Sequence, residues 1–163
     1  MQVLWAPWRM VYLAGEKTAG CIFCPAPEQD RRKALIAAET NDVLVMLNRY
    51  PYASGHVLVA PRRHVADPSG LPEDEFLALM RALHAGMSIV GEELQSEGMN
   101  VGINLGRAAG AGIDGHLHWH IVPRWNGDTN FMPMLADTRV MPEHLEATYE
   151  RLQPRFAAWA KTV

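Results

Sequence analysis

Three histidines stand at alternating positions in the segment HLHWHIV: His116, His118 and His120. A β-strand directs alternate side chains to one face, so this pattern predicts three imidazoles in a row on one side of a strand. Imidazole acts as a base, a nucleophile or a metal ligand near neutral pH, so the row indicates chemistry. Same-face neighbours on a strand lie about 6.6 Å apart, so one ion with bonds of about 2.1 Å binds at most two of them. The row is better suited to separate contacts along an extended substrate, such as a chain of phosphates.

Cys21 and Cys24 are the only cysteines in the chain, and they form a C-x-x-C pair in the segment GCIFCPAP. Two cysteines are too few for a disulfide scaffold, which leaves a metal-binding knuckle, a redox pair or two incidental thiols. A redox pair is typical of a strand followed by a helix that begins at the first cysteine. Pro25 and Pro27 indicate a loop instead, so the spacing favours metal.

A glycine-rich loop, GRAAGAGIDG, precedes the histidines and contains Gly110, Gly112 and Gly115 in a G-x-G-x-x-G pattern. A dinucleotide-binding loop leads from a strand into a helix, whereas this loop leads from one expected strand into another, so we reject that interpretation. Backbone without side chains can still approach a phosphate closely and direct N–H groups at it. A long, flexible hairpin loop is the alternative.

A second polar group, Asn48, Arg49 and His56, flanks the expected turn in LNRYPYASGHVLVAP. Asparagine and histidine beside apolar strand residues can fix a ribose or an imidazole by hydrogen bonds. Ordinary turn polarity is the alternative interpretation.

Length and composition limit the class of protein. The chain has 163 residues, 48% hydrophobic and 20% charged, which predicts a single globular domain over residues 1–163. No run approaches the ~18 apolar residues of a membrane helix, and Pro7 and Arg9 interrupt the N-terminal segment before a secretory core forms. We therefore expect a cytoplasmic protein that does not bind membranes. The net charge of −3 and the pI near 6.1 argue against nucleic acid as a partner.

The hydrophobic patterns predict both strands and helices. A long helix begins at Pro72 with acidic residues in its first turn and carries one apolar stripe to about Gly98. A second helix is expected over residues 142–153, in a C-terminal segment 142–163, and residues 1–30 form an arm that contains the knuckle. Strands are expected over residues 34–38, 43–47, 56–61, 99–105 and 116–123.

These motifs together resemble a known family. HLHWHIV fits the histidine triad signature, in which three histidines alternate with apolar residues, and NRYPYASGHVLVAP looks like the matching segment of the Fhit-type branch. LWAPWRMVY, CIFC, NLGRAAGAG and HIVPRWNGDTNFMP are similar to bacterial diadenosine tetraphosphate hydrolases or phosphorylases of this family. The resemblance covers roughly residues 4–150. It implies an α+β fold, with the long helix on a five-stranded antiparallel sheet, and a two-fold homodimer.

The resemblance also implies roles for individual residues. His118 is similar to the family's nucleophile, which attacks the α-phosphorus of a dinucleoside polyphosphate and forms a nucleotidyl-histidine intermediate. His120 would contact the phosphate and assist the leaving group, with His56 as a fourth catalytic histidine. Asn48 and Asn104 would hold the nucleotide, with Gly110 and Gly112 offering backbone groups to the phosphates. Water or inorganic phosphate would release the nucleotide, so the resemblance leaves hydrolase and phosphorylase open.

The same comparison completes the C-x-x-C pair. Zinc-bearing members with this knuckle use two histidines in addition, at positions that correspond to His64 and His116. Cys21, Cys24, His64 and His116 would then form a closed shell around one structural zinc ion per chain.

One departure concerns the loop before the triad. Many relatives carry Gln and Ser or Thr there, whereas this chain has Ala111 and Ile113, so backbone N–H groups replace side-chain contacts to the leaving phosphate. Two other classes stay open from the residues alone. One is a metal-dependent hydrolase that uses a histidine pair of the strand, and the other is a noncatalytic zinc-containing binding module.

Overall fold

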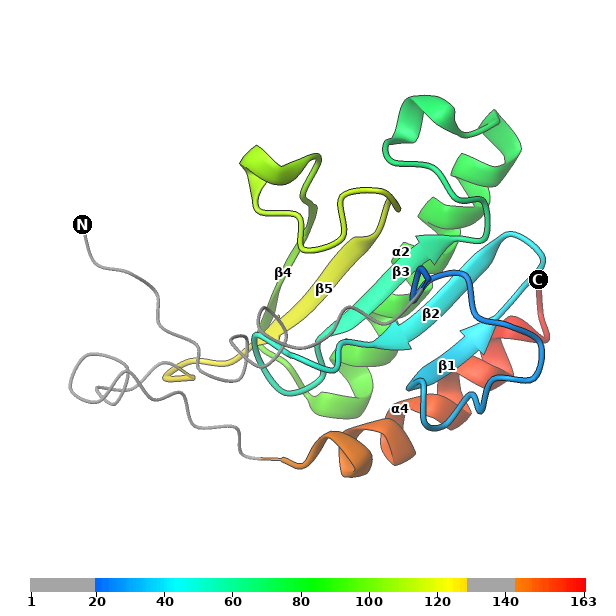
Figure 1. Ribbon diagram of the computed structural model, residues 1–163. Coiled ribbons are helices and arrows are strands. Elements are labelled where there is room, and N and C mark those ends of the chain that lie inside the picture. The colour runs from blue at the N-terminus through cyan, green and yellow to red at the C-terminus, as the bar shows by residue number, and fades with distance from the viewer. Residues whose placement is uncertain (1–19, 129–142) are drawn as a thin grey trace.

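The computed structural model describes residues 20–128 and 143–163, and its strands form one antiparallel sheet in the order β1-β2-β3-β5-β4 (Figure 1). Every pairing in the sheet is antiparallel, which confirms the predicted α+β fold with five strands. The strands are β1 (Ile36–Glu39), β2 (Val43–Leu47), β3 (Val57–Pro61), β4 (Gly98–Ile103) and β5 (Trp119–Arg124).

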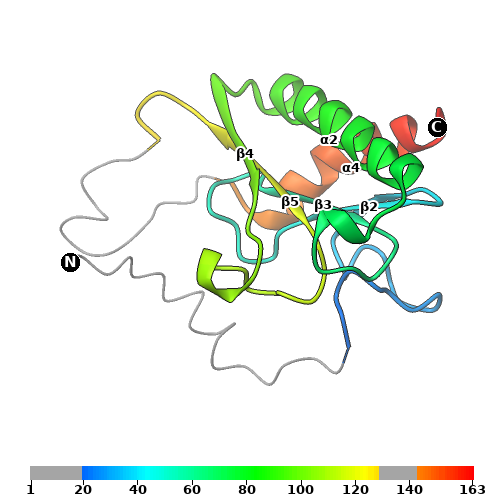
Figure 2. The same ribbon diagram turned by 90° about the horizontal axis from the view of Figure 1, so that it is seen from above.

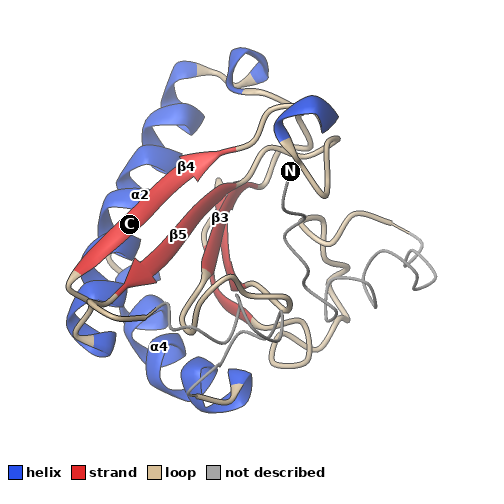
Figure 3. Ribbon diagram, turned by 90° about the vertical axis from the view of Figure 1, so that its left-hand side faces the viewer, coloured by secondary structure: helices blue, strands red, loops and turns tan. Residues whose placement is uncertain are grey.

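Both long helices, α2 (Glu73–Leu94) and α4 (Leu145–Ala160), cover the same face of the sheet, and the segment after residue 20 lies on the other face (Figures 2 and 3). Helix α2 has three acidic residues in its first turn, where the helix dipole favours negative charge. It ends at Leu94, and the next residue, Gln95, takes a left-handed conformation with φ 49°, so the expected extension to Gly98 was wrong. Gly86 lets α2 approach β5 closely, because a Cβ there would lie 2.8 Å from Ile121.

Helix α4 differs from the helix predicted over residues 142–153. It begins at Leu145, and it continues through Pro154 to Ala160. A proline inside a helix removes one backbone hydrogen bond, but the burial of Leu152 and Phe156 holds the turns on both sides of it against the core. Residues 1–19 of the predicted arm, and Pro142, lie outside the described residues.

The sheet separates two apolar clusters, because alternate residues of each strand face opposite sides. Val43, Val45 and Leu47 of β2 belong to the cluster beneath the helices. Leu44 and Met46 belong to the cluster on the other face, where Phe23 and Leu58 join them. The segment that follows residue 20 covers this second face, away from the helices (Figure 2).

The triad strand begins later than predicted. β5 starts at Trp119, whereas the sequence predicted a strand from His116. Pro61, at the end of β3, has no N–H to donate to a neighbouring strand. The N–H of Leu117 bonds to the carbonyl oxygen of Val65, at 2.6 Å, and not to β3. The alternation still holds, since Leu117 and Ile121 belong to the helix-side cluster while His118 contacts Phe23 on the other face.

The limits of β2 are those predicted, at Val43 and Leu47, while those of β1, β3 and β4 differ by at most two residues, as strand ends commonly do. β1 begins at Ile36 and not at residue 34, β3 begins at Val57, and β4 covers Gly98–Ile103 and not residues 99–105. None of the described helices combines the length and the apolar content needed to cross a lipid bilayer.

Candidate active site and metal cluster

The structure brings His56, His118 and His120 together on the sheet face opposite the helices. The ring centroids of His118 and His120 lie 5.0 Å apart, and His118 directly precedes β5. His56 directly precedes β3, and its Nε2 lies 2.9 Å from Nδ1 of His120. Gly55 makes the turn into β3 with φ 81°, a conformation that favours glycine.

Backbone contacts fix which nitrogen of His56 carries the hydrogen. The N–H of Tyr52 lies 3.1 Å from Nδ1 of His56, and an amide N–H can only donate, so this nitrogen accepts. In neutral His56 the hydrogen is therefore on Nε2, which donates to Nδ1 of His120. His120 then carries its own hydrogen on Nε2. The backbone N–H of Tyr52 and the ring of His56 thus determine that His120 donates through Nε2, on the side away from His56.

Asn48 contributes to the same chain. Its Oδ1 accepts from the N–H of Tyr50 at 2.9 Å, which orients the amide so that Nδ2 donates to Nδ1 of His56 at 3.2 Å. The predicted Asn48 and His56 pair therefore lies together, and the amide fixes an imidazole. Sequence reasoning missed Tyr52, whose ring also stacks on His56 at 4.7 Å and 29°. An aromatic residue inside the NRYPYASGH turn was the available signal.

His118 has the opposite tautomer to that of His56 and His120. Its Nδ1 lies 2.8 Å from the backbone carbonyl oxygen of His116, and because a carbonyl oxygen only accepts, the hydrogen sits on Nδ1. This leaves the lone pair on Nε2. Burial lowers the pKa of His118, against the hydrogen bond to His116, which raises it. Neutral His118 is thus favoured, with Nε2 as its unprotonated nitrogen.

The nucleotide-binding residues predicted around the row lie on connecting segments. Asn104 follows β4 directly and is half-buried. Gly110 closes the short turn Arg107–Ala109 in a left-handed conformation with φ 86°, and both Gly110 and Gly112 are exposed. The loop runs from β4 to β5, so the structure agrees with the rejection of a dinucleotide-binding loop.

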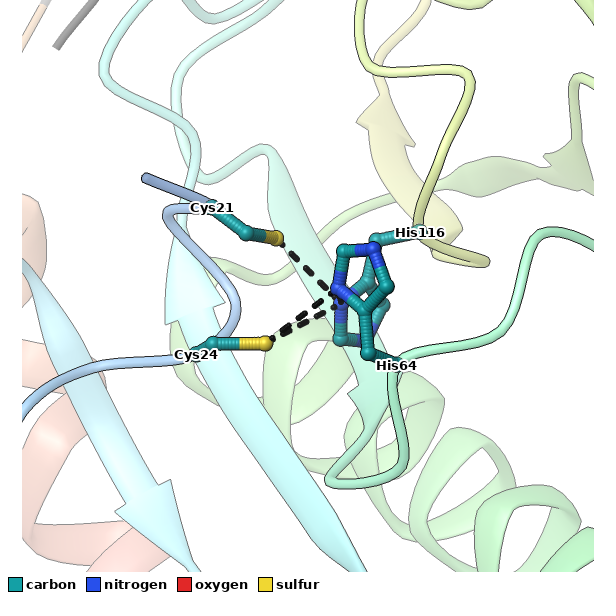
Figure 4. A group of neighbouring side chains, drawn as sticks. All are labelled: Cys21, Cys24, His64 and His116. Carbon is teal, nitrogen blue, oxygen red and sulfur yellow. Dashed lines mark hydrogen bonds between the residues drawn. The ribbon is translucent and has the colours of Figure 1, made fainter. Parts of the chain in front are cut away.

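The four predicted metal ligands form one cluster at the end of the sheet, next to the row (Figure 4). Nδ1 of His116 lies 3.3 Å from Sγ of Cys21, 3.6 Å from Sγ of Cys24 and 3.2 Å from Nδ1 of His64. Nδ1 of His64 lies 3.4 Å from Sγ of Cys24. The cysteines belong to a turn in which the N–H of Cys24 bonds to the carbonyl oxygen of Cys21, so no helix begins at the pair as a redox motif would prefer.

The donor set and its spacing fit a tetrahedral ion. Around a zinc ion with bonds of about 2.1 Å to nitrogen and 2.3 Å to sulfur, ligand atoms lie roughly 3.4–3.8 Å apart. Nε2 of His116 donates to the carbonyl oxygen of Pro61 at 2.8 Å, so Nδ1 directs its lone pair at the cysteines. Burial raises the pKa of the Cys21 thiol and lowers the pKa of His116. A neutral His116 is the form that binds metal.

The histidine pair of the triad strand is not part of this cluster. Within residues 20–128 and 143–163, Cys21, Cys24, His64 and His116 are the single group of three or more such side chains that could hold a metal ion. His56, His118 and His120 lie together but do not form such a group, which gives a metal-dependent hydrolase built on the His118 and His120 pair no support.

The fold and the site together, an antiparallel sheet with a row of imidazoles beside a Cys/His cluster, characterise the class of protein. The HIT domain model matches residues 29–127 of this chain. The chain belongs to the histidine triad family, which confirms the resemblance predicted from its motifs.

Two relatives are named for their action on diadenosine polyphosphates. The AP-4-A phosphorylase of Mycobacterium tuberculosis is 34% identical, over 96% of this chain and 85% of that protein. The bis(5'-adenosyl)-triphosphatase of Dictyostelium discoideum is 33% identical, over 57% of this chain and 62% of that protein. Among solved structures, a zinc-bound histidine triad family protein from Mycobacterium smegmatis is 28% identical with a TM-score of 0.62, covering 79% of this chain and 88% of that one.

Proposed function

We propose that this protein is an enzyme that cleaves dinucleoside polyphosphates, such as diadenosine tetraphosphate, at the α-phosphate. Membership of the histidine triad family and 34% identity to an AP-4-A phosphorylase support this substrate class. The single observation that carries the proposal is the hydrogen bond from Nδ1 of His118 to the carbonyl oxygen of His116, since it leaves Nε2 of His118 as a lone-pair donor in the row.

The first step is a displacement at phosphorus. Nε2 of His118 attacks the α-phosphorus, a P–N bond forms, and the P–O bond to the departing nucleoside polyphosphate breaks. A neutral imidazole with a fixed tautomer needs no prior deprotonation to do this. For diadenosine tetraphosphate, the step leaves an adenylyl group on His118 and releases ATP.

His120 assists this step as a hydrogen-bond donor. Its Nε2–H is set by the chain from Tyr52 through His56, so it can donate to a phosphate oxygen as negative charge develops on the leaving group. In this chain of hydrogen bonds His56 lies behind His120, one residue further from the substrate. A donor that is already oriented costs no reorganisation when the bond breaks.

The second step releases the nucleotide from His118. Attack by water on the phosphorus breaks the P–N bond and gives AMP, while attack by inorganic phosphate gives ADP. Both acceptors meet the same adenylyl-histidine, so the first step is common to a hydrolase and a phosphorylase. We propose the common step, with the acceptor to be measured.

The nucleotide contacts follow from the same arrangement. We assign the ribose to Asn48 and Asn104, and the phosphates to the backbone of the loop at Gly110 and Gly112. Asn48 has one further amide hydrogen and one further oxygen lone pair beyond its bonds to His56 and Tyr50. These groups suit a ribose hydroxyl, which both donates and accepts.

We propose zinc for the Cys/His cluster, held by Cys21, Cys24, His64 and His116. Two thiolates and two imidazoles at these spacings match the shell that zinc prefers, and the zinc-bound relative from Mycobacterium smegmatis supports the choice. A zinc ion with four protein ligands stabilises the fold and has no open coordination position for a substrate. It would tie the turn at residues 21–24 to the end of β3 and to the triad segment.

We also propose a two-fold homodimer. β4 forms one edge of the sheet, and Val101 on this strand and Leu105 beyond it are exposed hydrophobic residues. An exposed edge strand offers unpaired backbone groups to a second chain.

Incubation with diadenosine tetraphosphate, with and without inorganic phosphate, tests the proposed activity. ATP and AMP as products mean hydrolysis, and ATP with ADP formed only when phosphate is present means phosphorolysis. No product under either condition would contradict the proposed substrate.

A further inference from the structure

Phe23 lies between the two cysteines of the C-x-x-C turn, and its ring is buried, with an exposed fraction of 1%. It belongs to the apolar cluster on the sheet face opposite the helices. The ring also stacks on His118, with centroids 4.8 Å apart and an angle of 27° between the planes. One face of the His118 imidazole is therefore in contact with a flat aromatic side chain.

The hydrogen bond to His116 does not by itself fix the plane of His118. The bond holds one ring nitrogen, at 2.8 Å from the carbonyl oxygen. The terminal torsion of a histidine has broad minima, so the ring can still tilt about this contact. Aromatic pairs favour offset-stacked or edge-to-face arrangements, so a buried phenyl ring stacked on one face of His118 limits the tilt that the hydrogen bond allows.

We propose that Phe23 is a positioning residue for His118, because its ring holds the imidazole in the plane in which Nδ1 bonds to His116 and Nε2 faces the substrate. The inference rests on the function proposed above, since the orientation of Nε2 matters only if His118 attacks. It gives the C-x-x-C turn a second task besides its two thiols. Small errors in the direction of attack cost more in rate than in binding.

Two substitutions in the same turn separate this role from packing. Phe23→Leu keeps an apolar side chain and removes the ring, while Phe23→Tyr keeps the ring. Ile22→Ala is the matched control, because Ile22 precedes Phe23 and is 39% exposed. Thermal melting of each variant shows whether it is folded.

The test is long-range ¹H–¹⁵N NMR of the imidazoles in the full-length protein with zinc added, at about pH 8, where histidine is neutral. Loss of signals in His118→Asn assigns His118. We expect one tautomer for His118, with the hydrogen on Nδ1, and ring protons shifted upfield by Phe23. In Phe23→Leu the nitrogen shifts should move toward a tautomer mixture and the ring protons downfield. Phe23→Tyr and Ile22→Ala should match the unmodified protein.

Kinetics give the second readout. With diadenosine tetraphosphate, kcat of Phe23→Leu should fall roughly tenfold, with KM within about twofold of the unmodified value, as expected when transition-state alignment and not binding is lost. Unchanged His118 signals or unchanged kcat in a folded Phe23→Leu protein would overturn the proposal.

If Phe23→Leu does not fold, the unmodified protein decides. A tautomer mixture at His118, or ring protons without an upfield shift relative to the exposed His84, would overturn the proposal. The two failures remain distinct, because NMR does not require turnover. An inactive protein whose His118 signals still respond to Phe23→Leu contradicts the proposed function and supports the positioning contact.

Discussion

Nε2 of His56 and Nδ1 of His120 lie 2.9 Å apart, and the backbone N–H of Tyr52 on the far side of His56 determines which of the two nitrogens donates. This determines which group each of the two neighbouring histidines presents. His120 presents a hydrogen on Nε2, while His118, bonded through Nδ1 to a carbonyl oxygen, presents a lone pair. Neighbouring histidines in one strand segment thus have different tautomers, which is the arrangement that a nucleophile and a donor to the leaving group need.

Substitution of His56 tests this chain of hydrogen bonds. We expect His56→Leu to lower kcat by roughly tenfold to hundredfold, because His120 loses the donor that fixes its tautomer. His56→Gln retains an N–H donor on a side chain of similar reach and should lose less. His56 is buried, and the N–H of Tyr52 loses its acceptor in His56→Leu, so about 1–3 kcal/mol of stability is also lost. Steady-state kinetics well below the melting temperature measures the effect, and equal rates for both variants would count against it.

Metal content tests the Cys/His cluster. We expect about one zinc per chain by elemental analysis, since four ligands form one closed shell. Cys21→Ser and Cys24→Ser should lose the metal and lower the melting temperature, because the turn is then no longer tied to His64 and His116. His84→Ala is the control, as His84 is exposed on α2 outside the cluster and its loss should leave the zinc in place. A protein purified from zinc-containing medium without any bound metal would disprove the assignment.

The carboxyl group of Glu143 makes stability depend on pH at the start of α4. Burial raises its pKa, but hydrogen bonds from Thr148 at 2.7 Å and Arg151 at 2.9 Å outweigh burial, and the net pKa is lowered from 4.5. A lowered pKa means that the stabilisation is present above pH 4.5 and is lost as the pH falls through the folded pKa. Glu143→Gln should cost about 0.5–1 kcal/mol at neutral pH, and this difference should shrink in acid. Thermal melts across acid and neutral pH measure it; a difference that is constant with pH would contradict the ion pair.

The proposed homodimer predicts a sedimenting species of two 18.2 kDa chains at micromolar concentration. Sedimentation velocity across a dilution series measures it. Val101→Lys on the exposed side of β4 should shift the distribution toward the monomer if this edge forms the interface, and Leu77→Lys, on the exposed surface of α2, is the matched control. A single 18.2 kDa species at every concentration would exclude the dimer.

The parts of the fold that depend on local pattern were predictable from the sequence. The five strands and the helix from Glu73 follow from the periods of their apolar residues, and the alternation in HLHWHIV placed His118 and His120 on one face. The exact ends were not predictable, because they depend on single backbone contacts. Leu117 leaves the ladder for Val65, and α4 passes through Pro154 because its neighbours are buried.

The contacts that set each histidine's role lie beyond sequence reasoning. His116 meets Cys21 across 95 positions of the chain, and only the resemblance, not the spacing, indicated His64 as the fourth ligand. The tautomers depend on which backbone group faces each ring nitrogen. The stacking of Phe23 on His118 requires the whole segment after residue 20 to fold across the sheet, and no periodicity in CIFC encodes that.

The central claim is that His118 becomes covalently attached to the nucleotide. Rapid acid-free quenching of the enzyme during turnover of diadenosine tetraphosphate, followed by digestion and mass spectrometry, measures this directly. We expect an adenylyl group on the peptide that contains His118. His118→Asn should form no adduct and show no turnover, while nucleotide binding by calorimetry is retained. Turnover by the His118→Asn protein, or an adduct on a different residue, would contradict the account.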